Sequence, residues 1–474
     1  MMGEVGWFLL ITINALVLLY FVVLNSTYLI TSVTAFRSLR SYARRLKTVD
    51  IGELIRSGAA LPVTLVAPAY NEEATCVEAT RALLTLEYPD YEVVIVNDGS
   101  TDATLARLIE AFELEQAPRF PSASVPTAPI RATYRSARYR NLWVVDKENG
   151  KKADAINAGL NLTRTPLFCV IDSDSLLEPQ ALMRVSRPFL EDARTIAAGG
   201  IIRIVNGTTV NRGRVRDVRL PTSLLARFQI LEYLRSFHSG RLGWAEMNAT
   251  MIISGAFGLF RRWVVVEAGG FRTNTVGEDM ELVVRLHRHC HDNGIPYRIV
   301  YIPDPVAWTE CPETVRTLAR QRDRWQRGLV ETLTRHRTML LRPRYGTVGM
   351  LSYPYFFFLE MIGPVIEMSG YLAFAITLAL GLASGNFVLA FLALAIVFGV
   401  ALSVAALGLE ELSFRRYKHT GDLLQLFWLA IAENFGYRQL NSWWRIRGMW
   451  SALRGKTAWG EQKRKGFDRQ ASTP

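Results

Sequence analysis

The chain has 474 residues, enough for more than one domain, and a formal net charge of +12 at pH 7. Such a basic balance fits nucleic acid, an anionic membrane surface or a phosphorylated substrate. Because the basic residues cluster beside apolar runs, we expect a membrane partner and no nucleic acid. The four cysteines lie far apart and form no C-x-x-C pair, which excludes an obvious disulfide framework and indicates a reducing, cytosolic setting for the polar part.

The chain opens with an apolar run that has no charged residue from Val5 to Phe36. This run exceeds the ~20 residues that span a bilayer, and it lacks the basic start and small-residue cleavage site of a signal peptide. We therefore predict a transmembrane helix over residues 1–36. Residues 37–60 begin with the basic stretch "RSLRSYARRLK", which predicts a cytoplasmic juxtamembrane linker and an amino terminus outside.

Three apolar segments between residues 61 and 310 each end in polar residues: "PVTLVAPAYNEE", "YEVVIVNDGSTDAT" and "PLFCVIDSDSLLEP". Helical stretches such as "TCVEATRALLTL" and "KADAINAGLNL" lie between them. This alternation predicts an α/β domain with a mostly parallel, Rossmann-like sheet covered on both faces. Ligands bind beyond the carboxyl ends of such strands. The polar residues predicted there are Asn71, Glu72, Asp98, Asp172 and Asp174.

Asp172 and Asp174 lie two residues apart at the third strand end, where their carboxylates repel each other unless a cation lies beside them. A Mg2+ or Mn2+ ion with oxygen ligands fits, and it would also bridge phosphates. A pair of solvated turn acids is the alternative, but Asp98 at a second strand end favours the metal. The chain has no G-x-x-x-x-G-K-[ST] loop and no G-x-G-x-x-G after the first strand. Metal and basic side chains would therefore have to hold any phosphate.

Two further segments carry candidate site residues. "KENGKKADAIN" supplies Lys147, Lys151 and Lys152, which form either a solvated basic turn or, as we favour, a contact to a diphosphate or a base. A helix predicted to begin around Met280 follows Gly277-Glu278-Asp279. On its own, Asp279 fits an N-terminal cap better than a general base that takes a proton from a hydroxyl group.

The carboxy-terminal part is apolar again, and residues 347–410 predict two transmembrane helices. The first is expected to break near Gly363-Pro364, because proline kinks a helix. Glu360 and Glu367 lie in or beside it, and they are either charges near the interface or the lining of a polar pathway. Both interpretations remain open.

Residues 311–346 are predicted to form basic interfacial helices. Residues 411–474 predict an interfacial or re-entrant helix and a basic cytoplasmic tail. A full span over 421–447 is the alternative, although Glu433 and Asn434 interrupt its apolar core. With the amino terminus outside and the tail inside, we expect three spans.

Five motifs, in this order and spacing, resemble those of the processive family-2 glycosyltransferases, the cellulose, hyaluronan, chitin and poly-N-acetylglucosamine synthases. No single motif is specific, but the set is. It covers residues 61 to 330, and the flanking membrane segments fit by layout. The motifs are Pro68-Ala69-Tyr70-Asn71-Glu72-Glu73, Asn97-Asp98-Gly99-Ser100-Thr101-Asp102, Asp172-Ser173-Asp174, Gly277-Glu278-Asp279 and Gln321-Arg322-Asp323-Arg324-Trp325.

The resemblance implies a GT-A fold and inverting, metal-dependent transfer of a sugar from a UDP-sugar to a growing β-linked polysaccharide. It favours an N-acetylhexosamine donor, Mg2+ or Mn2+ as cofactor, and secretion through a channel of the chain's own helices. The implied partners are the UDP-sugar, a polysaccharide acceptor, the lipid bilayer and secretion proteins. The implied location is the inner (plasma) membrane, with several passes and a cytoplasmic catalytic domain.

The resemblance also assigns roles by position. Asp174 would ligate the metal, and Asp279 would be the catalytic base, with Glu278 beside it. The nucleotide-sugar residues would be Tyr70, Glu72, Asp98, Lys152, Asp172, Gln321 and Arg324. The acceptor residues would be Gly255, Ala256, Phe257 and Trp325.

Some features depart from the family. Gly150-Lys151-Lys152 stands where Gly-Gly-Lys is common, a single amino-terminal span replaces a pair, and no regulatory domain is evident after the last span, so we expect no cyclic-dinucleotide sensor. Two alternatives remain: a non-processive enzyme that adds sugar to a lipid acceptor, and a catalytically silent membrane subunit.

Overall fold

A computed structural model of the chain describes residues 4–48, 58–173, 175–211, 214–413, 417 and 419–455. The chain forms two compact units. The sheet unit comprises Arg40–Leu220 and Met247–Cys311, and the helical unit comprises Met1–Leu39, Pro221–Glu246 and Pro312–Gly460. The predicted boundary at residue 310 therefore lies close to the end of the sheet unit. The prediction missed that residues 221–246, inside the expected 61–310 domain, group with the helices.

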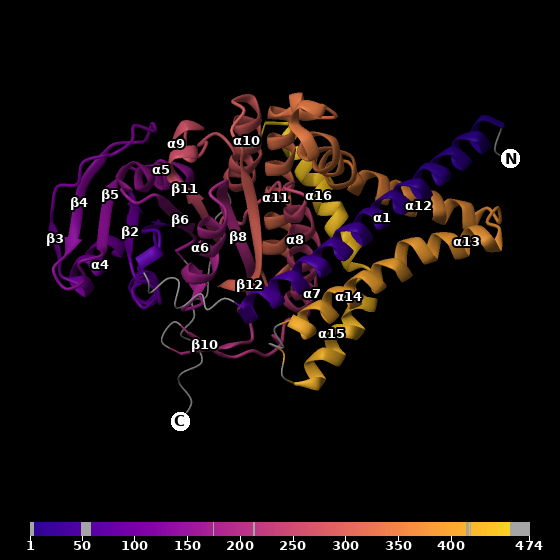
Figure 1. Cartoon of the computed structure of the whole chain (residues 1–474). Helices are drawn as coiled ribbons and strands as arrows, with labels where there is room; N and C mark the ends of the chain where they lie inside the picture. Colours follow the sequence, from indigo (N-terminus) through magenta and orange to yellow (C-terminus); the bar gives the residue numbers. More distant parts are fainter. Residues whose placement is uncertain are drawn as a thin grey trace. The chain divides into compact units, whose positions relative to one another are not determined.

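A mixed sheet dominates the sheet unit, with β3 and β4 at its left end in Figure 1. Its strand order is β3-β4-β5-β2-β1-β6-β11-β8-β12-β7. By the pairing of neighbours, β3, β5, β2, β1, β6, β8 and β12 run one way, and β4, β11 and β7 run the other. The strands are β1 (Val63–Ala69), β2 (Tyr91–Asp98), β3 (Leu114–Gln116), β4 (Ile130–Ser136), β5 (Leu142–Lys147), β6 (Leu167–Ile171), β7 (Leu176–Leu177), β8 (Thr195–Ile204), β11 (Phe257–Arg261) and β12 (Arg298–Thr309). The predicted α/β class with mostly parallel strands is confirmed.

The helices of the sheet unit include two that the apolar pattern predicted, over residues 76–83 and 152–162, and one that was predicted to begin near Met280. The bounds are α3 (Cys76–Leu83), α4 (Thr104–Phe112), α5 (Lys152–Leu162), α6 (Ala181–Glu191), α9 (Arg262–Glu267) and α10 (Glu278–Asp292). A separate hairpin pairs β9 (Thr209–Asn211) with β10 (Arg214–Asp217). The two helical stretches named from the sequence, before and after the second strand, correspond to α3 and α5.

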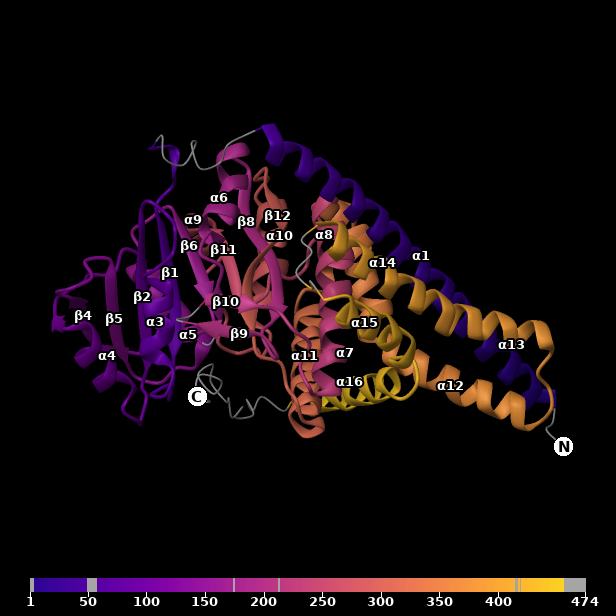
Figure 2. The ribbon, with the colours of Figure 1, turned by 90° about the horizontal axis from the view of Figure 1, so that it is seen from below.

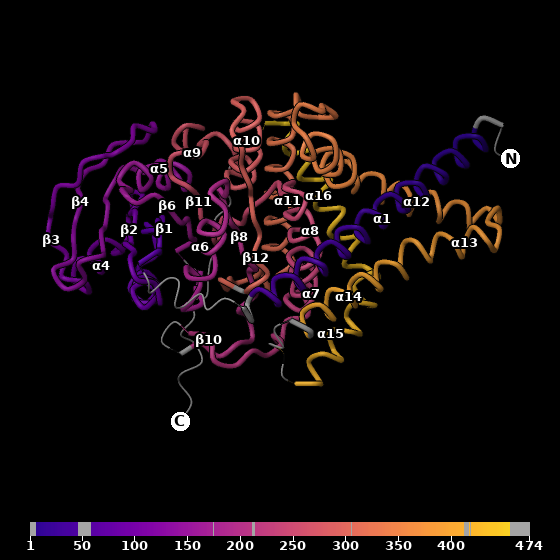
Figure 3. The backbone as a smooth tube through the Cα atoms, in the orientation of Figure 1, coloured from indigo at the N-terminus to yellow at the C-terminus, as the bar shows by residue number. Residues whose placement is uncertain are grey.

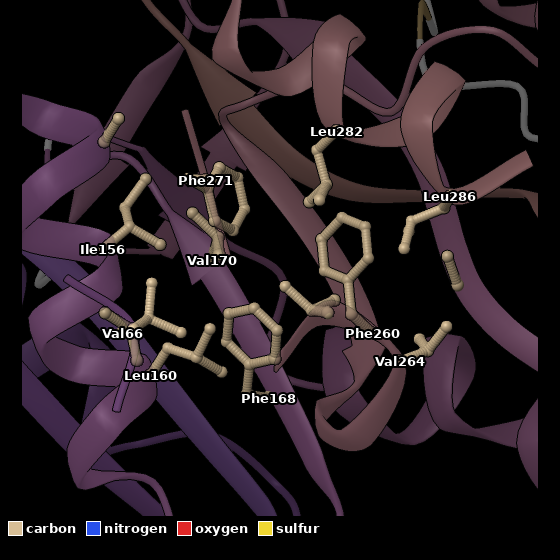
Figure 4. Close-up of a cluster of buried hydrophobic side chains, with 14 of the residues drawn as sticks. Val66, Ile156, Leu160, Phe168, Val170, Phe260, Val264, Phe271, Leu282 and Leu286 are labelled. Atoms are coloured by element: carbon tan, nitrogen blue, oxygen red, sulfur yellow. The ribbon is translucent and has the colours of Figure 1, made fainter. Parts of the chain in front are cut away.

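The core of the sheet unit fixes the two helices that begin at candidate site residues. In Figure 4, Ile156 and Leu160 of α5 meet Val66 of β1, and Leu282 of α10 lies over Phe260 of β11. A Cβ atom at Gly159 would collide with Val66, so α5 approaches β1 closely. Dense packing of this kind leaves little freedom to the amino-terminal ends of α5 and α10.

The helical unit contains helices from three parts of the chain. Residues 221–246 form α7, η2 and α8, which Figure 3 shows among α11, α14 and α15. The bounds are α1 (Glu4–Thr48), α7 (Leu224–Leu234), η2 (Arg235–Arg241), α8 (Leu242–Glu246), α11 (Val315–Arg335), η3 (Arg337–Met339), η4 (Pro343–Tyr345), η5 (Val348–Ser352), η6 (Tyr355–Met361), α12 (Gly363–Ala379), α13 (Gly385–Leu392), η7 (Ala393–Val397), α14 (Phe398–Ser413), α15 (Thr420–Ala432) and α16 (Tyr437–Leu453).

Two helices in the described part of the chain, Gly6–Arg45 and Gly385–Glu411, are long and apolar enough to cross a membrane. A third candidate is the pair Val348–Met361 and Gly363–Ala379, bent by 45°, so the predicted break at Gly363-Pro364 is confirmed. The amino-terminal helix does not end at Phe36. Its basic continuation stays helical to the end of α1, because charge marks the edge of a membrane without ending a helix.

The predicted interfacial segment forms two helices, α15 and α16, in place of one. The interruption lies at Glu433–Gly436, where Gly436 has a φ of +96°. α15 has 13 residues, fewer than the ~20 that a span requires. This geometry fits an interfacial or re-entrant segment better than a single crossing over 421–447.

Glu360 and Glu367 point into the helical unit. Glu360 Oε2 lies 2.9 Å from Arg445 Nη2 of α16. Glu367 accepts hydrogen bonds from Ser442 Oγ at 2.8 Å and from Tyr20 of α1 at 3.3 Å. Both carboxylates thus have partners on other helices, which favours a polar interior over charges that merely reach the interface.

Close approach of α1 and α12, visible in Figure 2, generates a prediction about stability. A Cβ atom at Gly370 would lie 2.6 Å from Val17 Cγ1, whereas one at Gly408 of α14 meets no described heavy atom within 4 Å. Gly370→Ala should therefore destabilise the protein by about 2 kcal/mol through overpacking. Gly408→Ala should be neutral or stabilising by up to about 1 kcal/mol, because alanine favours a helix.

Thermal unfolding of the purified chain in detergent, followed by size-exclusion chromatography, measures both variants. Equal midpoints for Gly370→Ala and Gly408→Ala would show that α1 and α12 do not pack at this glycine.

Candidate functional site

The strand register brings the candidate segments to one edge of the sheet. β5, β2, β1 and β6 are parallel neighbours, with Ala69 opposite Asn97 and Asp98 opposite Lys147. β11 runs antiparallel to β6, with Phe257 opposite Ile171. The residues that follow β1, β2, β5 and β6 and those that precede β11 therefore meet at the same edge, as the sequence predicted for the strand ends.

The loop after β1 is fixed to the loop after β2. Asn71 adopts a φ of +54°, and its side-chain oxygen accepts a hydrogen bond from Thr101 N at 2.8 Å. Glu72 Oε1 accepts from Ser173 Oγ at 3.4 Å, so Glu72 lies beside the D-S-D segment. Tyr70 is half exposed. Tyr70 and Asn71 are therefore exposed at this edge, and Glu72 is partly buried.

Asp98 is held from the protein interior. The fully buried Lys147 ammonium lies 2.8 Å from Asp98 Oδ1 and 2.5 Å from Asp154 Oδ1. Gly150 N also donates to Asp98 Oδ1, at 3.0 Å. Lys147 is thus a buried counter-ion, which fits neither the favoured contact to a diphosphate or a base nor the alternative of a solvated turn. Lys151, in contrast, is exposed.

A second lysine joins acids from two other elements. Lys152 Nζ, at the start of α5, lies 2.5 Å from Asp172 Oδ1 and 3.4 Å from Glu278 Oε1. Asp279 Oδ2 accepts a hydrogen bond from Gly255 N at 3.0 Å. A Cβ atom at Gly255 would lie 3.1 Å from Lys152 Nζ and 3.4 Å from Asp279 Oδ2. The absence of a side chain at Gly255 therefore lets Lys152 and Asp279 both approach its backbone.

Lys152 and the neighbouring acids stabilise one another's charged forms. Burial alone would lower the pKa of Lys152, but Asp172, Glu278 and Asp279 raise it above its usual value. Burial raises the pKa of Glu278, and Lys152 partly opposes that rise. Lys152 is therefore charged at neutral pH. Two acids contact the Lys152 ammonium directly, and Asp279 adds to the negative potential around it.

Asp279 is not the cap of α10. The helix begins at Glu278, two residues earlier than predicted, and its N-cap residue is Gly277. Asp279 Oδ1 accepts a hydrogen bond from the adjacent Met280 N at 2.8 Å. The capping interpretation is wrong, and the second carboxylate oxygen of Asp279 points to Gly255.

The predicted metal site is only partly described. Asp174, the assigned ligand, lies outside the described residues. Among the residues that are described, no group of three or more His, Cys, Asp or Glu side chains is arranged to hold a metal ion. Asp172 offers carboxylate oxygens of the kind that Mg2+ and Mn2+ prefer, although Lys152 already contacts one of them. The donor chemistry fits a divalent ion, provided that further ligands join Asp172.

The acceptor residues assigned by resemblance differ in exposure. The Phe257 side chain is fully buried at the start of β11, and Ala256 is 7% exposed. Direct contact between the Phe257 ring and a ligand is therefore not what the structure shows, because the ring belongs to the core. Trp325, on α11 of the helical unit, is 44% exposed. Gln321 on the same helix is buried, and Arg324 is partly exposed.

His287, which sequence reasoning missed, anchors α10 behind Asp279. Its Nε2 lies 2.7 Å from Thr250 O, in the segment that leads to Gly255, and its Nδ1 lies 2.7 Å from Tyr297 Oη. Burial lowers the pKa of His287 from 6.5 to about 4. A lone histidine on an amphipathic helix gives no sequence signal for this role.

The lowered pKa of His287 predicts that the folded protein loses stability in acid. The folded protein binds the His287 proton less tightly than the unfolded chain does, so stability that is present above pH 6.5 is lost as the pH falls towards 4. The loss should reach roughly 3 kcal/mol. In His287→Gln, which cannot gain this proton, unfolding midpoints measured between pH 7 and pH 4.5 should depend less on pH. Parallel pH profiles for the two proteins would contradict the assignment.

Comparison with known proteins identifies the family of related sequences. A model described as glycosyl transferase family group 2 matches residues 167–402, and one described as glycosyl transferase family 2 matches residues 64–120. The poly-β-1,6-N-acetyl-D-glucosamine synthase of Staphylococcus aureus (strain COL) is 28% identical over 322 residues, 67% of this chain and 66% of the relative. The synthase of the same name from Staphylococcus epidermidis is 26% identical over 58% of this chain and 56% of the relative.

Solved structures give weaker similarities. A Pyrobaculum calidifontis mannosyltransferase in complex with GDP-Man and Mn2+ is 18% identical, with a TM-score of 0.48 over 88% of this chain and 99% of that one. S. aureus TarS 1-349 in complex with UDP-GlcNAc is 15% identical, with a TM-score of 0.38 over 80% of this chain and 92% of that one. The two family models and the synthase relatives together show that the chain belongs to glycosyltransferase family 2 and is a glycosyltransferase.

Proposed function

We propose that the protein transfers an N-acetylhexosamine from a UDP-sugar to a growing β-linked polysaccharide, with inversion at the sugar carbon. The observation that carries this proposal is the convergence of Asp279 and Lys152 on Gly255 at the edge of the sheet, in a chain that matches glycosyl transferase family models. The sequence similarity to poly-β-1,6-N-acetyl-D-glucosamine synthases favours the same type of donor and acceptor.

In the proposed reaction, Asp279 is the general base. The acceptor hydroxyl oxygen attacks the anomeric carbon of the donor, its proton passes to Asp279, and the bond from that carbon to the UDP oxygen breaks with its electron pair on the diphosphate. Attack opposite the leaving group converts an α-linked donor into a β-linkage. Glu278 stays beside the base, where its contact with Lys152 holds the start of α10.

The departing diphosphate acquires negative charge, which cations must stabilise. Lys152 and Arg324 would supply this from the chain, and Arg324 suits a two-point contact with phosphate oxygens. A Mg2+ or Mn2+ ion held by Asp174, with Asp172 nearby, would supply further positive charge to the phosphates when bound. Gln321 would assist at the diphosphate, and Tyr70, Glu72 and Asp98 would contact the nucleotide.

Acceptor binding would use Trp325, since an indole face packs on the C–H face of a sugar ring, together with the backbone at Gly255 and Ala256. The two apolar spans and the bent pair would fix the enzyme in the inner (plasma) membrane, with its sheet unit in the cytoplasm. The polar interior around Glu360 and Glu367 supports a route for the polymer through the helices.

Removal of the base gives the most direct test. Asp279→Asn should keep the Kd for UDP within about twofold and lower transfer by roughly a thousandfold, the scale of a lost general base. Asp292→Asn, at the far end of the same helix, is the control and should retain activity. Titration calorimetry with UDP and a transfer assay provide the measurements. Transfer by Asp279→Asn at a rate comparable to that of the parent would make the base assignment wrong.

Donor and metal preference need a separate test. Release of UDP by the purified protein should be fastest with UDP-GlcNAc, compared with UDP-Glc, UDP-GlcA and UDP-Gal, and should require Mg2+ or Mn2+. A chelator should stop it, and added metal should restore it. Metal-independent release, or preference for a donor without an N-acetyl group, would contradict the proposal.

Product size separates the proposed polymerase from an enzyme that adds one sugar to a lipid. Gel electrophoresis of the product should show a ladder or smear in the first case, and a single lipid-linked spot on thin-layer chromatography would indicate the second. Processivity is a proposal from the Q-x-x-R-W motif, and this measurement decides it.

A further inference from the structure

Arg322 stands between Gln321 and Arg324, and the proposed function gives it no role. It is 6% exposed, which is unusual for arginine outside an ion pair. Its guanidinium carbon lies over the Trp325 ring, 4.6 Å from the ring centroid. Its Nη2 forms an ion pair with Glu232 of α7. Arg322 therefore connects a partly buried acid to the exposed indole on its own helix.

Glu232 is itself fixed by a third helix. Its Oε1 accepts a hydrogen bond from Asn441 Nδ2 of α16 at 3.0 Å, while Oε2 contacts Arg322. The rings of Phe228 and Tyr437 stack with centroids 4.6 Å apart, which joins α7 to α16 at the same level. Both carboxylate oxygens are thus used, and the side chain of Glu232 cannot turn without losing a partner.

The backbone of α11 is equally restrained next to Arg322. A Cβ atom at Gly448 of α16 would lie 2.6 Å from Asp323 O, so the two helices touch there. Ser451 Oγ donates to Asp323 Oδ1 at 3.2 Å, and Asp323 pairs with Arg327 at 2.9 Å. The two residues inside the motif hold α11 against α7 and α16.

These contacts restrict the indole. A planar guanidinium stacks on an aromatic face, which an ammonium on a flexible stem does not do in the same way. With the guanidinium over its ring, Trp325 still exposes 44% of its surface. One part of the ring is therefore covered by a group that cannot move freely, and the remainder is available to a ligand.

We propose that Arg322, held by Glu232, is a positioning residue that sets the orientation of the Trp325 indole for the acceptor sugar. This inference rests on the proposed function, in which Trp325 binds the acceptor. It assigns an effect on acceptor binding to two residues, neither of which touches the substrate.

The test uses the full-length protein in detergent with a soluble β-linked N-acetylglucosamine oligosaccharide as acceptor. Arg322→Met should raise the acceptor KM by about tenfold, the scale of a lost cation–π contact. The donor KM and the affinity for UDP should stay within about twofold of the parent. Glu232→Gln should act in the same direction. Arg316→Met, which removes an exposed charge from the same helix, is the matched control and should leave every constant unchanged.

Arg322→Lys and a double variant separate positioning from general damage. Arg322→Lys keeps the charge opposite Glu232 but loses the flat stack, so its acceptor KM should lie between the parent and Arg322→Met. Trp325→Leu should raise the acceptor KM, and Arg322→Met added to it should have no further effect, since residues that act as a unit are not additive.

The outcomes separate the positioning role of Arg322 from the proposed function on which it rests. Equal effects of Arg322→Met on donor and acceptor constants, or full additivity with Trp325→Leu, would overturn the positioning role. A normal acceptor KM in Arg322→Met together with a raised one in Trp325→Leu would also reject it, with the proposed function intact. A normal acceptor KM in Trp325→Leu would reject the acceptor assignment of Trp325 itself. If Glu232→Gln fails to fold, the comparison of Arg322→Lys with Arg322→Met still decides.

Discussion

The Lys152 ammonium is the charge on which the acidic edge of the sheet depends. Asp172 follows β6, Glu278 and Asp279 open α10, and Lys152 opens α5. Three carboxylates this close would repel each other without a cation between them. The lysine lies at the amino-terminal end of a helix, where positive charge is unfavourable, so the acids stabilise the lysine as much as the lysine stabilises the acids. Fold stability and site charge are linked at this point.

Apolar packing places these charges. Gly159 lets α5 approach Val66 of β1, which fixes where Lys152 begins its helix. His287 holds α10 to the segment before Gly255, which fixes where Asp279 points. The core thus determines, through two helices, the distance between the proposed base and the proposed phosphate-binding lysine. Substitutions far from the edge can alter the site by moving either helix.

Sequence reasoning succeeded where a residue's environment follows from local pattern. Buried strands with polar ends predicted β1, β2 and β6 and the meeting of their ends, because parallel register is set by the sheet. It failed for Lys147, whose partners Asp98 and Asp154 are supplied by the fold, so that a basic turn in sequence is a buried ion pair in space. The predicted end of the first helix at Phe36 was also wrong, because an apolar run indicates contact with lipid and does not determine where a helix ends. Glu232 gave no signal, since its partner Arg322 is 90 residues away.

Partners that the fold supplies also explain why a tryptophan stands within charged residues on α11. Arg322 contacts α7 and Asp323 contacts α16, because neighbouring side chains leave a helix in different directions. Both charged side chains are paired inside the helical unit. Trp325 stays exposed, and the Arg322 guanidinium lies over its ring. A phenylalanine or leucine environment would hold the indole by burying it, and would remove the surface that a sugar needs. Charged neighbours hold the ring while keeping it accessible, and that is why a polar helix suits an aromatic binding surface.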